Sequence, residues 1–113
     1  MSGPESPLTH LSFQVLLALA DASRHGYGII KEIEERAGAG TAPSTGALYL
    51  ALQRMEGEGV IEPAAPPPEE TDARRKYYRI TARGRELARA ESRRLLELVA
   101  MARQKKLLAG GAR

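Results

Sequence analysis

The sequence predicts a mainly helical α+β fold, in which a short β-hairpin connects three N-terminal helices to a long C-terminal helix. Apolar residues recur at helical spacing in four segments, and most of these segments follow a residue that can cap a helix. Two short runs rich in β-branched and aromatic residues flank a proline-rich loop, as in a hairpin. The 113 residues have the length of one globular unit. We divide them into a region 1–81 that contains the hairpin and a helical region 82–113.

Composition restricts the classes of function. The chain has no cysteine, which excludes disulfides, thiol catalysis and zinc–thiolate sites and is compatible with a reducing cytoplasm. No apolar run reaches the length of a membrane span, and the first residues lack the order of a secretion signal, so we expect a cytoplasmic protein without membrane contact. No group of nucleophile, base and orienting residue is visible, so we expect neither an enzyme nor a cofactor.

The charge is divided unevenly along the chain. Residues 1–70 contain ten carboxylates and four Lys or Arg residues, whereas residues 71–113 contain four carboxylates and thirteen Lys or Arg residues. This asymmetry favours a polyanionic partner for the C-terminal half, although a solvated basic helix has the same composition.

The first helix opens at Pro7 or Thr9 and runs to about Ala22. It has two apolar stripes, one of Leu8, Leu11, Val15 and Leu19 and another of Phe13, Leu17 and Ala20. A helix that is apolar on two sides must be covered twice, once by its own domain and once by a candidate partner subunit.

A turn over residues 21–24 leads to a second helix, whose apolar face consists of Ile29, Ile30, Ile33 and Ala37. At its start, His25 is a capping or packing residue rather than a metal ligand, because metal sites need clustered ligands and the chain has only one other histidine. The glycines on either side of Tyr27 allow close approach to a phosphate or to a neighbouring helix.

The third helix begins after Ser44, since serine caps helices and Pro43 keeps the entry extended. Leu48, Ala51, Leu52 and Met55 form its core face, and Gly59 stops it. Thr45, Tyr49 and Gln53 form an exposed, uncharged stripe. The helix start favours phosphate, and small residues such as Gly46 let it come close. An ordinary solvated face is the alternative. The order of the three helices matches a helix-turn-helix.

The hairpin pairs a strand over residues 60–62 with one over 76–80, across an exposed, mobile loop from Pro63 to Arg75 that has no apolar anchor. Arg74, Arg75 and Lys76 bring three cations to the edge of this ribbon, beside the third helix. A helix-turn-helix with such a ribbon is a winged helix. The alternative is a solvated charge run that protects an edge strand from aggregation.

The C-terminal helix starts after the cap Thr81, runs from Ala82 to about Leu108 and ends at Gly110-Gly111. So long a helix cannot be covered by its own small domain, so two copies are expected to pack together. Its apolar stripe is interrupted by Glu91 and comprises Leu87, Ala88, Leu95, Leu98, Val99 and Ala102. With Phe13 and Leu17, this stripe (Ala88 apart) is the predicted dimer interface. A basic helix lying on a membrane is the alternative, weakened by the absence of aromatic anchors.

Motifs spread over residues 8–102 resemble those of the PadR family of bacterial transcriptional regulators. They are Leu8-Thr9-His10-Leu11-Ser12, His25-Gly26-Tyr27-Gly28-Ile29, Ser44-Thr45-Gly46-Ala47-Leu48-Tyr49 with Leu52, Gly59-Val60-Ile61, and Arg75-Lys76-Tyr77-Tyr78-Arg79-Ile80-Thr81-Ala82-Arg83-Gly84. The match is to the shorter branch, which has a single C-terminal helix.

The resemblance implies a repressor that binds a pseudo-palindromic operator in double-stranded DNA as a homodimer and is released by a small hydrophobic effector. In the family motif, the residues matching Ser44, Thr45 and Tyr49 face DNA and the wing matches Arg74, Arg75 and Lys76. From the residues themselves we add Tyr27, Pro43, Gly46 and Gln53, although the family often has a basic residue near Gln53. The chain has no tryptophan, so the family's tryptophan-mediated binding of flat aromatic drugs cannot apply.

The expected mechanism is positional. The third helix of each subunit would enter one of two successive major grooves about 34 Å apart, and the wings would supply charge. If six phosphates are neutralised, affinity should fall about a thousandfold between 50 and 200 mM salt. A winged-helix protein-interaction module that does not bind DNA is the alternative function.

Overall fold

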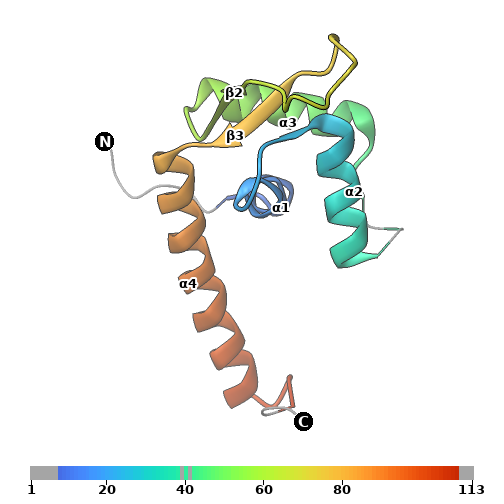
Figure 1. Cartoon of the computed structure of the whole chain (residues 1–113). Coiled ribbons are helices and arrows are strands. Elements are labelled where there is room, and N and C mark those ends of the chain that lie inside the picture. The colour runs from blue at the N-terminus through green and yellow to red at the C-terminus, as the bar shows by residue number, and fades with distance from the viewer. Residues whose placement is uncertain (1–7, 39, 41, 110–113) are drawn as a thin grey trace.

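The computed structural model describes residues 8–38, 40 and 42–109, which form four helices and a three-stranded sheet (Figure 1). In chain order the elements are α1 His10–Leu19, β1 Arg24–His25, α2 Gly26–Ala37, α3 Thr45–Gly57, β2 Ile61–Ala64, β3 Tyr77–Ile80 and α4 Ala82–Gln104. The predicted mainly helical α+β fold is confirmed.

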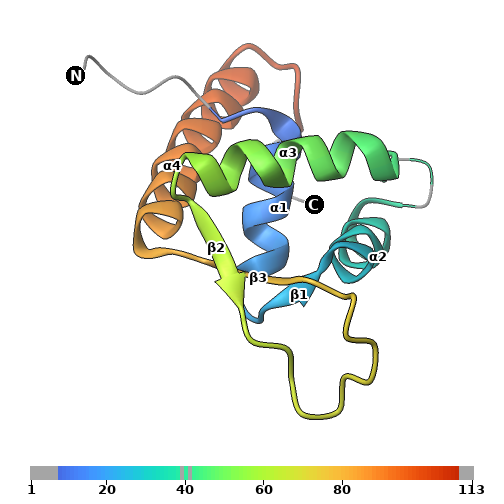
Figure 2. The same ribbon diagram turned by 90° about the horizontal axis from the view of Figure 1, so that it is seen from above.

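Helix α1 lies at the centre of the molecule, with α2, α3 and α4 around it (Figure 2). Thr9 caps it by accepting a hydrogen bond from the Ser12 N–H at 3.1 Å. The predicted end near Ala22 is wrong, because the helix stops at Leu19. Leu16, which belongs to neither predicted stripe, is fully buried. The alternative start at Pro7 lies outside the described residues.

The hydrophobic core consists of side chains from α1, α2 and α3, together with Val60, Ile61 of β2 and Tyr78 of β3. Its fully buried members include Val15, Leu16, Ile29, Leu48, Leu52, Met55 and Ile61. The predicted inner face of α3 is therefore confirmed. On α2, Ile29 and Ile33 are buried, whereas Ala37, on the same face in the last turn of the helix, is exposed.

Glycine ends α3 as predicted. Gly59 has a φ of +77°, which a residue with a side chain rarely adopts. Its N–H donates to the Glu56 carbonyl at 3.0 Å, and the Val60 N–H donates to the Met55 carbonyl at 3.1 Å. These two bonds form a Schellman motif, which satisfies the last carbonyls of the helix and sends the chain into β2.

The sheet has the strand order β1-β3-β2, and both neighbouring pairs are antiparallel. Ile61 pairs with Ile80 and Ala64 with Tyr77, so the hairpin reaches two residues beyond the predicted Glu62. Pro63 fits in β2 because this is an edge strand. The third strand, β1, was not predicted: Arg24, assigned to the turn, and His25, assigned to the start of the second helix, pair with the other side of β3, His25 opposite Tyr77.

Helix α4 starts at the cap Thr81, whose hydroxyl accepts from the Gly84 N–H at 3.0 Å. Its first half packs on the body of the molecule, and its second half extends away from it (Figure 1). The helix ends at Gln104, earlier than the predicted Leu108, and Gly110-Gly111 lie outside the described residues. The radius of gyration of 16.0 Å exceeds the roughly 13 Å of a compact domain of this length.

The inward face of α4 continues from the covered half into the exposed half. Leu87 and Ala88 pack on the core of the same chain, and Glu91 is buried next to them. A hydrogen bond from Arg94, which also forms an ion pair with Glu91, lowers the pKa of this carboxyl. Further along the same face, Leu98 and Val99 are exposed, while Leu95 and Ala102 are half-buried.

Candidate nucleic-acid interface

The capping of α3 and the packing of its opposite side together leave one face of this helix exposed. The Ser44 Oγ accepts a hydrogen bond from the Ala47 N–H at 3.1 Å and so starts the helix at Thr45. Because the opposite side is anchored in the core, Thr45, Tyr49 and Gln53 all point to solvent, as predicted. No residue from Thr45 to Gln53 carries a charge, so this face offers only hydrogen bonds and apolar contacts.

Leu50 is a residue of this face that the sequence reasoning missed. It is 67% exposed and follows Tyr49 directly. The predicted stripe was restricted to polar residues, which is why Leu50 was left out. Methyl groups on a recognition helix can contact the C5-methyl group of thymine, so an apolar residue here has a recognised use in base reading.

Tyr49 lies directly over the start of α2. A Cβ atom on Gly26 would come within 2.4 Å of the Tyr49 hydroxyl oxygen, so the absence of a side chain at Gly26 allows this approach. Tyr49 is nevertheless 48% exposed, and Tyr27 is 59% exposed. Of the two glycines around Tyr27, Gly26 thus allows close contact with a neighbouring helix, whereas a Cβ atom on Gly28 would meet only Arg24 and His25, at 3.6 Å or more.

His25 is a capping and packing residue, as predicted. Its Nδ1 accepts a hydrogen bond from the Gly28 N–H at 3.2 Å, which caps α2. Its ring meets the ring of Tyr77 edge-on, with centroids 5.1 Å apart. Burial, and secondarily the positive charge of Arg75, lower the pKa of His25, although Glu70 opposes them. The neutral imidazole is the form that can accept this hydrogen bond.

The three predicted wing cations all have carboxylate partners. Arg74 pairs with Asp72 at 3.1 Å and Arg75 with Glu70 at 3.4 Å, both within the wing loop. Lys76 pairs with Glu56, near the end of α3, at 3.5 Å. The sequence predicted a ribbon of cations, whereas the structure shows a ribbon of ion pairs.

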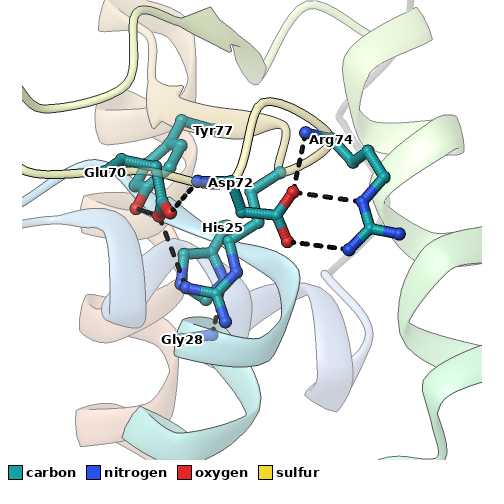
Figure 3. Close-up of polar contacts among 7 residues, drawn as sticks. His25, Gly28, Glu70, Asp72, Arg74 and Tyr77 are labelled. Carbon is teal, nitrogen blue, oxygen red and sulfur yellow. Dashed lines mark hydrogen bonds and ion pairs between the residues drawn. The ribbon is translucent and has the colours of Figure 1, made fainter.

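Glu70 anchors the loop that was predicted to have no apolar anchor (Figure 3). Only 9% of its side chain is exposed, and it accepts hydrogen bonds from the Tyr77 hydroxyl and the Asp72 N–H. These bonds, the tyrosine hydroxyl first, lower the pKa of Glu70 to about 2. The loop is exposed, as predicted, but it is attached to β3 by polar contacts.

A cleft of about 550 Å³ brings the predicted residues of α2, α3 and the wing together. Tyr27, Tyr49, Arg74, Arg75 and Lys76 all line it, with His25 and Asp72 among the other lining residues. Thr45 and Gln53 lie on the neighbouring exposed face of α3, and Pro43 and Gly46 lie at its start. The wing loop and α3 are on the same side of the molecule, away from the far end of α4 (Figure 1).

The described residues contain no group of three or more His, Cys, Asp or Glu side chains that could hold a metal ion. None of the helices they form is long and apolar enough to cross a membrane.

A helix-turn-helix followed by a β-hairpin, with an exposed helix and a wing on one side, defines a winged helix-turn-helix protein. Residues 15–90 match the model of the PadR-like family of transcriptional regulators. The chain therefore belongs to this family of transcriptional regulators, as its motifs predicted.

The chain also resembles individual known proteins. An uncharacterized 37.1 kDa protein of transposon TN4556 from Streptomyces fradiae is 37% identical over 84 residues, which are 74% of this chain and 22% of that protein. The chain thus spans about a fifth of the length of this relative. A PadR family transcription regulator from Clostridium difficile R20291 superimposes with a TM-score of 0.74 at 25% identity, over 85% of this chain and 97% of that one.

A second similar structure is that of Bacillus subtilis PadR in complex with operator DNA. Its TM-score is 0.62 at 22% identity, and the match covers 73% of this chain and 46% of that one. At this identity the likeness concerns the fold.

Proposed function

We propose that this protein is a repressor that binds a pseudo-palindromic operator as a homodimer. The observation that carries the proposal is the position of the uncharged, exposed face of α3 beside the wing and the cleft they share. The solved complex of Bacillus subtilis PadR with operator DNA, which has the same fold, supports the choice of duplex DNA as the partner.

Base reading is assigned to α3. Tyr49 and Gln53 offer hydrogen bonds to base edges, and Leu50 and the Thr45 methyl group offer contacts to thymine methyls. We assign contacts with the DNA backbone to the start of this helix, at Pro43, Ser44 and Gly46, and to Tyr27. Arg74, Arg75 and Lys76 supply the charge, modulated by their carboxylate partners.

The exposed half of α4 is the reason for proposing a homodimer. Leu98 and Val99 continue a face whose first half is covered by the chain's own core, so a second copy is the natural cover for the rest. Leu95 and Ala102 lie on the same face, and the half-exposed Phe13 and Leu17 of α1 complete the surface. Leu87 already packs on the core and would belong only to the edge of this interface.

In the proposed mechanism, the bound dimer excludes polymerase or an activator from a promoter. A small hydrophobic effector that changes the angle between the two α4 helices would change the spacing of the two α3 helices and release the DNA. A thermal-shift screen that finds no stabilising small molecule would count against this regulation and would leave the DNA binding untouched.

The direct test is selection of bound duplexes from genomic fragments with the full-length protein, followed by titration of the recovered site. Tyr49→Ala should weaken binding about 5-fold to 150-fold for each half-site that loses one good base contact, while sedimentation shows an unchanged dimer. Tyr49→Phe retains the ring over Gly26 and isolates the hydroxyl. Recovery of no duplex at all would refute DNA binding and favour a protein-interaction module.

A further inference from the structure

The wing carries carboxylates that a DNA-binding surface should avoid. Residues 69–76 contain Glu69, Glu70 and Asp72 beside three cations, so this segment has no net charge. Carboxylates next to DNA repel its phosphates and weaken binding. The contacts of Glu70 and Asp72 indicate what offsets this loss of affinity.

Asp72 holds Arg74 through three hydrogen bonds (Figure 3). The Arg74 backbone N–H donates to Oδ1 at 2.9 Å, Nε–H donates to Oδ1 at 3.1 Å, and Nη2–H donates to Oδ2 at 3.3 Å. A guanidinium has five N–H donors in a planar fork. Two are used here, so both donors of Nη1 and one of Nη2 remain on the outer edge.

The outer edge of Arg74 is open to solvent, because 91% of the side chain is exposed. An unrestrained arginine samples many rotamers and loses this freedom when it binds DNA. The hydrogen bonds to Asp72 reduce the conformational entropy that Arg74 loses on binding, because they fix the plane of the guanidinium before DNA arrives.

Asp72 is itself held in place from the sheet. Its N–H donates to the Glu70 Oε2 at 2.9 Å, and the Glu70 Oε1 accepts from the hydroxyl of Tyr77. Tyr77 is buried in β3 and packs on the ring of His25, which caps α2. A continuous series of contacts therefore leads from the start of α2 to the guanidinium of Arg74.

We propose that Asp72 and Glu70 are positioning residues for DNA binding: Glu70 fixes the wing loop on β3, and Asp72 holds Arg74 with its outer edge ready for a backbone phosphate. Arg74 lines the same cleft as Tyr27 and Tyr49, so the phosphate belongs to the strand bordering the groove that α3 enters. This inference rests on the proposed DNA binding.

The sign of one substitution separates positioning from simple repulsion. Asp72→Asn adds one positive charge per protomer, which by electrostatics alone strengthens DNA binding. If Asp72 positions Arg74, the variant instead binds about tenfold more weakly, because the charged bidentate contact is lost. Glu69→Gln is the matched control: it makes the same charge change in the same loop, and Glu69 has no hydrogen bond or ion pair with any described residue.

Affinities are measured by fluorescence anisotropy, with the full-length protein and a duplex that selection recovers, over a series of salt concentrations. We expect weaker binding for Asp72→Asn and equal or tighter binding for Glu69→Gln. The slope of log affinity against log salt should become shallower by about 0.9 for each phosphate contact that Asp72→Asn loses, which a general loss of fold would not produce.

A double-mutant cycle shows whether Asp72 acts through Arg74. In an Arg74→Ala background, Asp72→Asn should no longer weaken binding, whereas an effect on folding would persist there. Equal or tighter binding by Asp72→Asn in the wild-type background overturns the inference, and so does an equal loss in both backgrounds. If the wild type binds no duplex, the proposed function itself fails, which is a separate outcome.

Discussion

Replacing Gly84 by alanine tests how closely α4 is joined to the DNA-binding body. A Cβ atom at this position would come within 2.2 Å of the Val60 carbonyl oxygen and 2.9 Å of the Ile80 Cγ1. The oxygen is part of the backbone and already accepts the Thr81 N–H at 3.1 Å. It therefore cannot move aside without breaking the connection between the hairpin and α4.

The magnitude follows from three opposing contributions to the free energy of unfolding. Overpacking of this kind costs about 1–3 kcal/mol. Loss of the hydrogen bond from Thr81 to Val60 costs about 1 kcal/mol more. Alanine has a higher helix propensity than glycine, which returns about 1 kcal/mol. Gly84→Ala should therefore lower the stability by about 1–3 kcal/mol.

The assay is thermal and urea unfolding followed by circular dichroism, at one fixed protein concentration because unfolding of a dimer depends on it. Each kcal/mol should lower the melting temperature by roughly 4 °C or more. Gly57→Ala, in α3, is the control: its Cβ would meet nothing within 4 Å, so this variant should be as stable as the wild type or slightly more stable. If Gly84→Ala matches Gly57→Ala, the inferred contact between α4 and the hairpin is wrong.

Two further predictions concern assembly and acid stability. Leu98→Glu should dissociate the proposed dimer in analytical ultracentrifugation, whereas Leu96→Glu, at a more exposed position among the arginines of α4, should not; dissociation by both would place the interface elsewhere. The pKa of Glu70 falls from 4.5 to about 2 on folding, so its contribution to stability is complete above pH 4.5 and is lost as the pH falls toward 2. Unfolding of Glu70→Gln should therefore depend less on pH in this window, and an unchanged pH dependence would contradict the anchoring role.

The sequence by itself determined where three of the helices start and where α3 ends. Thr9, Ser44 and Thr81 each cap a helix through a hydrogen bond to the N–H three residues later, and Gly59 ends α3 through its left-handed backbone. These signals act over a few residues, so they can be recognised without the rest of the fold. The family motifs and the buried face of α3 were equally legible, because helical periodicity is also local.

The tertiary structure alone decided which residues meet across the chain. Arg24 and His25 have no strand pattern and became β1 only because β3 lies beside them. The approach of Tyr49 to Gly26 and the anchoring of Glu70 on Tyr77 depend on how separate elements pack. The sequence showed acids and cations in the wing, but charge has no periodicity that assigns partners. Only the folded loop brings Arg74 to Asp72, because a hydrogen bond requires both groups at a defined distance and angle.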